Sequence, residues 1–414
     1  MQRSFIEIAE DDPFPIQNLP FGIFSTSGNL APRGGTRIGS YVLDLQVLEA
    51  KRLLPTIDLF GFPTLNAFVG MGQDTWRGVR ASLQELLDER NPKLRDNPRL
   101  RQRAFVPVDQ VKTHLPLAIG DYTDFYSSKQ HASNIGRLVR DKDNPLLPNW
   151  SHLPVAYHGR VSSLVPTGTA IRRPYGQIKC PNEVAPRLAP SRELDFELEV
   201  GYLIGRDNAL GDPVPVEKAH EHVFGLILVN DWSARDIQRW EYLPLGPFLA
   251  KNMGTSVSPW IVTLDALEPF RTSGPPQDPV PLAYLRHGDK RSYDIRLEVR
   301  LQAAGADRPE LISRTNLKEI YWDLNQQIAH HTINGCNLRV GDLLASGTVS
   351  GSEPGTYGCL LELAWGSKTP IQLEGGKQRT FLEDGDSVIL NGFAQGDGFR
   401  VGFGELEGTI LAAR

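Results

Sequence analysis

The chain has 414 residues, of which 40% are hydrophobic and 22% are charged, an ordinary composition for a folded protein. Its formal net charge is −5, and acidic and basic residues are interspersed, so we expect no nucleic-acid partner. The three cysteines form no closely spaced pair, and no run reaches the ~20 apolar residues of a membrane helix. We therefore expect a cytoplasmic protein without a disulfide framework, a zinc–thiolate site or a membrane anchor.

The N-terminal part of the sequence is predicted to form a small separate unit, residues 1–116. Short strands are expected at 22–25 and within 36–45, where Gly39–Ser40 provides a turn. A helix is then indicated by apolar residues at helical spacing: Trp76, Val79, Leu83, Leu86 and Leu87. The charged, proline-broken segment 88–102 suits a linker or a pair of solvated helices, and a plain surface segment is the favoured interpretation.

The remainder of the chain, residues 117–414, is rich in strand patterns. Alternating or apolar runs predict strands at 162–171, 193–204, 224–232, 293–303, 341–351 and within 387–411. Helical patterns are fewer and lie at 216–223 and 316–335, the second ending on Gly335. This balance predicts a mostly β (α+β) catalytic domain with a few helices.

Several acidic residues are spaced so that they can share one site. Side chains alternate along a strand, so Asp195, Glu197 and Glu199 are expected on one face, which is usually a solvent-exposed face. Asp231 ends an apolar run, and Asp124 lies in a short segment with a histidine and two tyrosines, which favours a cluster. Clustered carboxylates repel one another unless a cation neutralises them, and carboxylate ligands suit calcium, magnesium or manganese.

His131, seven residues after Asp124, is a candidate general base. A histidine in this role needs an acidic partner to fix its tautomer, and Glu362 is a candidate whose distance the sequence does not give. A lone histidine is more often structural, so the pattern alone leaves both readings open. His330 and His331 lie in a helical pattern and point about 100° apart, which argues against a catalytic pair.

Seven long segments resemble the fumarylacetoacetate hydrolase family. They are FPIQNLPFGIFS, DYTDFYSSKQHASNIGR, LPNWSHLPVAYHGRVSS, NDWSARDIQRWEYLPLGPFLAKN, GTSVSPW, GCNLRVGDLLASGTVSG and DGDSVILNGFAQGDGFRVGFGE. The resemblance runs from about residue 5 to the C-terminus. Shorter relatives, such as acylpyruvate hydrolases and certain decarboxylases, share mainly the NDWSARD core, so this extent favours the members that act on fumarylacetoacetate.

The resemblance implies a fold, an assembly and an activity. The expected fold is a small SH3-like N-terminal barrel at 1–116 and a larger mixed β-roll catalytic domain at 117–414, assembled as a homodimer. The expected reaction is metal-dependent hydrolysis of a carbon–carbon bond, giving fumarate and acetoacetate in the last step of tyrosine and phenylalanine breakdown. The alternatives are a hydrolase of an acylpyruvate or other 1,3-diketo acid, a decarboxylase, or a catalytically silent calcium-binding scaffold.

The resemblance also implies roles for individual residues. The expected ligands of calcium, or of magnesium or manganese, are Asp124, Glu197, Glu199 and Asp231. His131 matches the general base, Glu362 the acid that orients it, and Arg235, Gln238 and Lys251 the polar groups around the reacting carbonyl. The substrate-contacting positions are Tyr126, Arg140, Tyr157, Gln238, Tyr242 and Thr348. A second, magnesium site would use Asp231, the backbone carbonyl of Lys251 and Thr255.

Each of these functional roles has a purely structural alternative. Arg235 can be a structural ion-pair partner of Asp236 or of another acid, and the tyrosines can be core aromatics with a bonded hydroxyl. Lys251 is harder to explain structurally, because it follows an apolar run and an unpaired buried charge is costly. Ala250 stands where animal members of the family usually have glycine.

Overall fold

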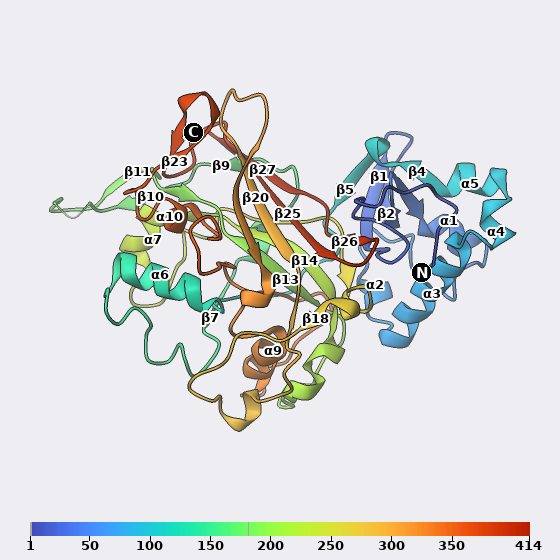
Figure 1. Ribbon diagram of the computed structural model, residues 1–414, viewed down its shortest axis with the longest axis horizontal. Helices are drawn as coiled ribbons and strands as arrows, with labels where there is room; N and C mark the ends of the chain where they lie inside the picture. Colours follow the sequence, from blue (N-terminus) through green and yellow to red (C-terminus); the bar gives the residue numbers. More distant parts are fainter. Residues whose placement is uncertain (1, 181) are drawn as a thin grey trace.

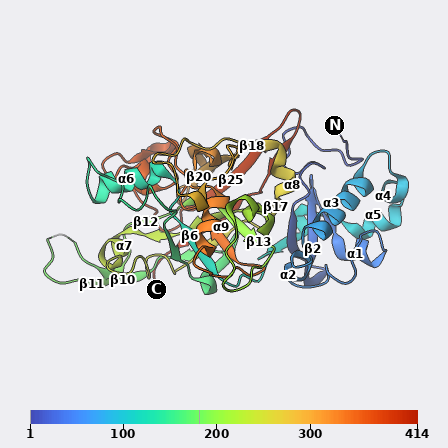
Figure 2. The same cartoon turned by 90° about the horizontal axis from the view of Figure 1, so that it is seen from below.

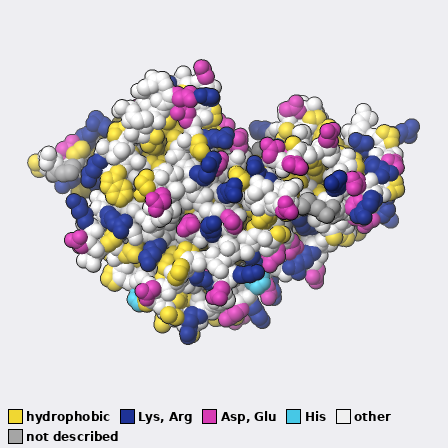
Figure 3. All heavy atoms as spheres, viewed as in Figure 1, with side chains coloured by type: hydrophobic (Ala, Val, Ile, Leu, Met, Phe, Trp, Pro, Cys, Tyr) yellow, Lys and Arg dark blue, Asp and Glu magenta, His cyan; other side chains and the backbone are white. Residues whose placement is uncertain are grey.

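The chain forms two units that lie side by side in the computed structural model, which describes residues 2–180 and 182–414 (Figure 1). The smaller unit contains the N-terminal elements, drawn in blue and cyan, and the larger unit contains the rest. The view from below shows the same separation (Figure 2). Basic and acidic side chains are mixed over the face seen in Figure 3, as their interspersion in the sequence predicts.

The smaller unit is built on a five-stranded sheet of order β4-β3-β2-β1-β5. Its strands are β1 (Phe21–Thr26), β2 (Asn29–Ile38), β3 (Tyr41–Asp44), β4 (Phe105–Pro107) and β5 (Val111–His114). The predicted turn between β2 and β3 is confirmed: Ile38 pairs with Tyr41, and Gly39 has a φ of +51°, a backbone conformation that glycine adopts without strain. The sheet is therefore an antiparallel meander of β1, β2 and β3, extended at each edge by a strand distant in the sequence, β5 beside β1 and β4 beside β3.

Five helices complete this unit. They are α1 (Leu45–Ala50), α2 (Asn66–Val69), α3 (Gln73–Leu87), α4 (Pro92–Arg95) and α5 (Pro98–Ala104). The predicted helix is α3, and it buries the apolar stripe that indicated it. The favoured interpretation of 88–102 as a plain surface segment is wrong. Proline in the first turn and a capping asparagine before it start both α4 and α5, and each buries one leucine, Leu94 and Leu100.

The larger unit contains two main sheets. The first has eight strands, in the order β7-β6-β22-β13-β14-β16-β8, with β17 also paired to β14. These strands are β6 (Tyr122–Phe125), β7 (Ala156–His158), β8 (Leu164–Pro166), β13 (Leu198–Ile204), β14 (Val223–Asp231), β16 (Thr255–Val257), β17 (Val262–Thr263) and β22 (Leu343–Ala345). The fully buried β13 and β14 lie at its centre.

The second main sheet has six strands, in the order β21-β20-β25-β27-β9, with β26 paired to β25. Its strands are β9 (Ile171–Arg172), β20 (Arg296–Gln302), β21 (Glu310–Asn316), β25 (Ser387–Gln395), β26 (Arg400–Gly402) and β27 (Leu406–Leu411). Four strand pairs are β10 (Tyr175–Ile178) with β11 (Arg187–Pro190), β12 (Leu194–Asp195) with β15 (Ser233–Ala234), β18 (Arg271–Thr272) with β19 (Ser292–Tyr293), and β23 (Ile371–Gln372) with β24 (Gln378–Arg379).

Short helices connect these sheets: α6 (Lys129–Val139), α7 (Arg235–Glu241), α8 (Leu264–Leu267), α9 (Leu324–Thr332) and α10 (Leu360–Leu363). The segment 216–223 forms a 3₁₀ helix at Val216–His222. The long helix predicted at 316–335 is wrong in its first half. The Asp323 side chain accepts hydrogen bonds from the backbone of residues 325 and 326 in a capping box, so α9 begins only there. Within the described residues, no helix has both the length and the apolar character needed to span a membrane.

Two predicted strands are divided in the structure. The segment 162–171 forms β8 and β9, which belong to different sheets. The segment 193–204 forms β12 and β13, with Phe196 and Glu197 between them. The second break matters for the site, because the regular alternation of side chains along a strand does not extend across it.

The two units pack closely. The strand β1 extends toward the larger unit: Phe21 and Ile261 exchange two backbone hydrogen bonds of 3.0 and 2.7 Å. The ring of Phe21 also lies 5.8 Å from that of Phe224 in β14. A Cβ atom on Gly22 would lie 2.6 Å from the Trp260 ring, so glycine permits this close approach.

Candidate active site

Four buried carboxylates meet at the ends of strands in the eight-stranded sheet. Asp124 lies in β6, Glu199 in β13, Asp231 at the end of β14, and Glu197 in the break before β13. The antiparallel β13–β14 pair brings Glu199 opposite Val229, and the parallel β6–β22 pair positions Asp124. One oxygen from each carboxylate lies within 4.8 Å of the others. We expected these four acids to share one site, and the structure brings them together.

The cluster has unsatisfied acceptor capacity. Both carboxylate oxygens of Glu199 and Oδ1 of Asp124 are buried and accept no hydrogen bond from any described residue. Burial raises the pKa of Asp124 and of Glu199 well above their ordinary values, and the neighbouring carboxylates raise it further. A divalent cation would satisfy the free oxygens and remove this repulsion, and an all-carboxylate donor set fits a hard cation such as calcium, magnesium or manganese.

Lys251 supplies one of the positive charges in the site. Its Nζ lies 2.6 Å from Asp231 Oδ2 and also contacts Glu197 Oε2. Burial alone would lower the pKa of Lys251, but the charges of Asp231 and Glu197 more than offset it, so the pKa is raised. Thr255 donates a hydrogen bond of 3.0 Å to the other oxygen of Asp231. The side chains of Lys251 and Thr255 therefore both contact the carboxylate of Asp231.

Arg235, at the start of α7, supplies the second charge. Its Nε lies 2.9 Å from Asp195 Oδ2, and its Nη1 lies 2.8 Å from Glu197 Oε1. Nη1 also donates to Gln238 Oε1 at 3.2 Å, while the buried Nη2 has no partner among the described residues. The acid considered as its structural partner, Asp236, instead accepts bonds of 2.7 Å from Ser191 and from the Arg192 backbone.

Asp195 does not join Glu197 and Glu199 in the four-acid cluster, although Arg235 contacts both Asp195 and Glu197. The break at residues 196–197 turns the Asp195 carboxylate toward Arg235 and the start of α10. There it also accepts hydrogen bonds from the backbone of Leu360 and Leu361, at 2.7 and 3.1 Å. Asp195 thus ties α10 to Arg235, and it stands outside the four-acid cluster.

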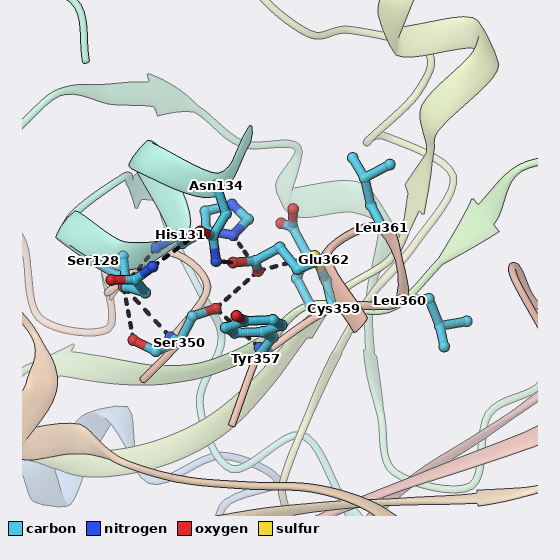
Figure 4. A network of polar contacts seen from close by, with 12 residues as sticks. Ser128, His131, Asn134, Ser350, Tyr357, Cys359, Leu360, Leu361 and Glu362 are labelled. Carbon is cyan, nitrogen blue, oxygen red and sulfur yellow. Dashed lines mark hydrogen bonds and ion pairs between the residues drawn. The ribbon is translucent and has the colours of Figure 1, made fainter. Parts of the chain in front are cut away.

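His131 and Glu362 form a buried pair beside the cluster (Figure 4). Nδ1 of His131 lies 2.7 Å from Glu362 Oε2, although the two residues are 231 positions apart in the chain. His131 lies in the first turn of α6, whose N-terminal cap, Ser128, accepts a hydrogen bond from the His131 backbone. The Tyr126 ring packs edge-on against the imidazole, with ring centroids 5.2 Å apart. Nε2 is the ring nitrogen left for proton transfer.

Glu362 accepts hydrogen bonds from three further donors that the sequence analysis did not predict. Asn134 donates to Oε1 at 2.9 Å, while Ser350 and the Cys359 thiol donate to Oε2 at 2.8 and 3.2 Å. Burial opposes ionisation, but the charge of His131 and these hydrogen bonds lower the pKa of Glu362 overall. Of these three donors, only Asn134 could have been found from the sequence, because it follows His131 by three positions and so lies on the same side of a helix.

The expected substrate-contacting residues differ in their exposure and in their hydrogen bonds. Tyr157 donates a 2.6 Å hydrogen bond to Asp231 and a 3.4 Å bond to Asp124, and the hydroxyl of the buried Thr348 has no partner among the described residues. Arg140 is exposed, and Tyr242, just after α7, is 39% exposed. The missed Tyr122 also donates to Asp124, at 3.1 Å.

Two family models match the chain. The model described as fumarylacetoacetase N-terminal matches residues 17–116, and the model described as fumarylacetoacetate (FAA) hydrolase C-terminal matches residues 122–411. The second match alone covers more than half of the chain and includes all of the acids and the histidine–glutamate pair described above.

Curated relatives match along the whole chain. Proteins named fumarylacetoacetase from Mus musculus and Homo sapiens are 54% and 52% identical over 414 residues, which covers 99% of this chain and 99% of each relative. The fumarylacetoacetase of Arabidopsis thaliana is 50% identical, covering 99% of this chain and 98% of the relative. Among solved structures, a fumarylacetoacetate hydrolase from Exiguobacterium antarcticum shares the fold, with a TM-score of 0.55 and 18% identity over 95% of this chain and 99% of that one.

Proposed function

Because this chain belongs to the fumarylacetoacetate hydrolase family, we propose that it is a fumarylacetoacetase. This enzyme is a hydrolase that uses water to cleave a carbon–carbon bond of fumarylacetoacetate, giving fumarate and acetoacetate. The observation that carries the proposal is the agreement of about half of all residues, over the full length, with relatives of that name in animals and plants. In this role the enzyme completes the breakdown of tyrosine and phenylalanine in the cytoplasm.

A divalent cation is assigned to Asp124, Glu197, Glu199 and Asp231. The unpartnered oxygens of Glu199 and Asp124 support this assignment. When bound, the cation polarises the attacked carbonyl and stabilises negative charge on the 1,3-diketone. We assign calcium to this position. On the family resemblance, a second site for magnesium is assigned to Asp231, the Lys251 backbone carbonyl and Thr255.

The residues of the chain divide the reaction between them. His131, held by Glu362 at Nδ1, removes a proton from water through Nε2, and the water oxygen attacks the ketone carbon next to the unsaturated acid. Arg235, Gln238 and Lys251 stabilise the oxyanion that forms, where one such donor is worth about 3 kcal/mol. Arg235 Nη2 is a donor still free for this task.

Bond cleavage then sends the electron pair to the carbon of the leaving acetoacetate, as an enolate. A proton returns to that carbon from the imidazolium of His131 or from Lys251, so the proton taken from water is restored. Tyr126, Arg140, Tyr157, Gln238, Tyr242 and Thr348 are assigned to binding the substrate. The free hydroxyl of Thr348 supports its assignment.

The proposal is tested by following the loss of the ultraviolet absorbance of fumarylacetoacetate. Wild type and His131→Ala are compared with chelator and with added calcium. We expect rapid, metal-dependent loss for the wild type and a drop of about 100- to 10,000-fold in kcat for the variant. A folded, calcium-loaded wild type that leaves fumarylacetoacetate intact but cleaves an acylpyruvate would contradict the substrate assignment and favour the alternative hydrolase. Release of carbon dioxide would indicate a decarboxylase.

We extend the proposal to fold details and assembly. We assign an SH3-like barrel to residues 1–116 and a mixed β-roll to 117–414, a division supported by the two family matches. We also assign a homodimer. The loop after α7 supports it, because its apolar side chains are exposed, with Leu245 at 96% and Phe248 at 66%. Exposed apolar residues grouped in this way are typical of an interface.

A further inference from the structure

The carboxylate of Glu362 is surrounded by hydrogen-bond donors on every oxygen (Figure 4). Oε1 accepts from Asn134, and Oε2 accepts from Ser350 and Cys359 in addition to His131. Glu362 is fully buried, where an ionised carboxylate is costly unless donors compensate it. Glu362 therefore accepts three hydrogen bonds in addition to the one that joins it to His131.

The donors are themselves held in the donating orientation. The Ser350 hydroxyl accepts a 2.9 Å hydrogen bond from the Gly358 backbone, so its own proton is directed at Glu362. The amide oxygen of Asn134 accepts from Gln130 at 2.9 Å, which turns the amide nitrogen toward Glu362. These second contacts fix two groups that would otherwise be free to rotate.

We propose that Asn134, Ser350 and Cys359 are positioning residues that hold Glu362 as an ionised acceptor in front of His131. A carboxylate accepting four hydrogen bonds keeps one orientation and has little tendency to take the imidazole proton. His131 is thereby kept in the tautomer with the proton on Nδ1, and Nε2 stays free to act as the base. The inference rests on the proposed function, because it assigns these residues to the base of that reaction.

The test removes each donor in the full-length, calcium-loaded enzyme. Ser350→Ala and Asn134→Ala are each expected to lower kcat by about 10- to 100-fold, the kinetic equivalent of one hydrogen bond to a charged group. KM is expected to change less than about twofold, since none of these residues is assigned to the substrate. Cys359→Ala is expected to give a smaller loss, because a thiol is a weak donor, and Cys359→Ser to restore the rate.

Ser258→Ala is the matched control. Ser258 is also a fully buried serine, and its hydroxyl also accepts a 2.9 Å hydrogen bond from a backbone N–H, that of Leu228. It should lose stability as Ser350→Ala does while keeping its kcat. Equal kcat losses in the two serine variants would overturn the proposal.

A double-variant comparison separates positioning from general damage. In a Glu362→Gln background, Ser350→Ala is expected to have almost no further effect on the residual rate, because its target is already neutral. Additive losses would overturn the inference. Failure of the proposed function is recognised separately, since wild type would then not turn over fumarylacetoacetate at all. In that case the same comparison is made on the acylpyruvate substrate that it does cleave.

Discussion

At the scale of single residues, Glu199 is the least satisfied group of the site. It is 0% exposed, and neither carboxylate oxygen has a hydrogen-bond partner among the described residues. The carboxylates of Asp124, Glu197 and Asp231 surround it and raise its pKa together with burial. A residue in this situation lowers the stability of the metal-free protein and is stabilised when a cation binds.

We predict that Glu199→Gln separates the effect of this carboxylate on the stability of the metal-free protein from its effect on cation binding. The neutral amide removes a buried charge, so the metal-free variant should be at least as stable as metal-free wild type in urea denaturation. Calcium affinity should fall by more than the roughly 10- to 100-fold seen when a residue behind the ligands is lost. Calorimetric titration with calcium measures the second effect.

Glu298→Gln provides the control. Glu298 is also buried, but it lies 2.8 Å from the exposed Arg314, so neutralisation removes an attraction rather than a repulsion. This variant should lose at most about 1 kcal/mol and bind calcium normally. If Glu199→Gln bound calcium as tightly as wild type, the assignment of Glu199 as a ligand would be wrong.

Residue identities were predictable where spacing and the family resemblance pointed to the same positions. The structure brings the four acids together, and it places Nδ1 of His131 2.7 Å from Glu362, the partner that the resemblance implied. Asp195 lies outside the cluster, and alternation along a strand did not predict this because the strand is interrupted at residues 196–197. Ser350 and Cys359 were missed because a serine or cysteine far along the chain has no pattern that points to Glu362.

At the scale of elements, the start of α6 positions the histidine. Ser128 accepts a hydrogen bond of 3.2 Å from the His131 backbone and donates one of 3.2 Å to the Ser350 backbone. One side chain thus joins the first turn of α6 to the segment that contacts Glu362. A change at this cap affects both partners of the pair.

We predict that Ser128→Ala lowers both stability and activity. Loss of the cap should cost about 1 kcal/mol in urea denaturation, and kcat should fall because the first turn of α6 frays. Asn97→Ala is the comparison, since Asn97 caps α5 through a 3.0 Å bond from the Leu100 backbone, in the other unit. It should lose similar stability and retain its kcat. Unchanged kcat in Ser128→Ala would show that the cap has no part in positioning His131.

Helices and strands were predictable where the apolar pattern of a segment was long enough to identify the element. β1, α3 and β14 follow from local sequence, because each buries a continuous or periodic apolar set. The first half of the helix predicted at 316–335 failed for a different reason. The apolar spacing there continues across Asp323, but the hydrogen bonds of its side chain start the helix at that point.

At the scale of the whole molecule, the cluster links stability to pH and, on the proposed assignment, to calcium. The pKa values of Asp124 and Glu199 are raised in the metal-free folded protein, so these groups bind protons more readily there than in the unfolded chain. Their contribution to stability is present at low pH and is lost as the pH rises through the folded pKa. Calcium requires the ionised carboxylates, so its binding strengthens over the same range.

We therefore predict that added calcium raises Tm more at about pH 7.5 than at about pH 5.5. Comparing samples with and without calcium at the same pH cancels contributions from groups away from the site. Thermal unfolding followed by circular dichroism measures the difference. A calcium-induced shift in Tm that is equal at both pH values would indicate that the cluster is not the calcium site.

The division near residue 116 stays a prediction from the change in sequence pattern, and the arrangement of strands was not predictable. The eight-stranded sheet joins β6, at residues 122–125, to β22, at 343–345, in a parallel pair. Short strands of similar composition give no indication of which partner they will take at such a separation.

The separation of 231 positions between His131 and Glu362 also sets a delay during protein synthesis. At ribosomal rates of about 5–20 residues per second, the glutamate is added roughly 12–46 s after the histidine. Once Asp231 has been added, the nascent chain carries all four acids but still lacks Glu362 and, until residue 345, β22, the neighbour of β6. On the proposed roles, the pair of His131 and Glu362 forms only after Glu362 has been added, so we expect a chain truncated before Glu362 to be inactive.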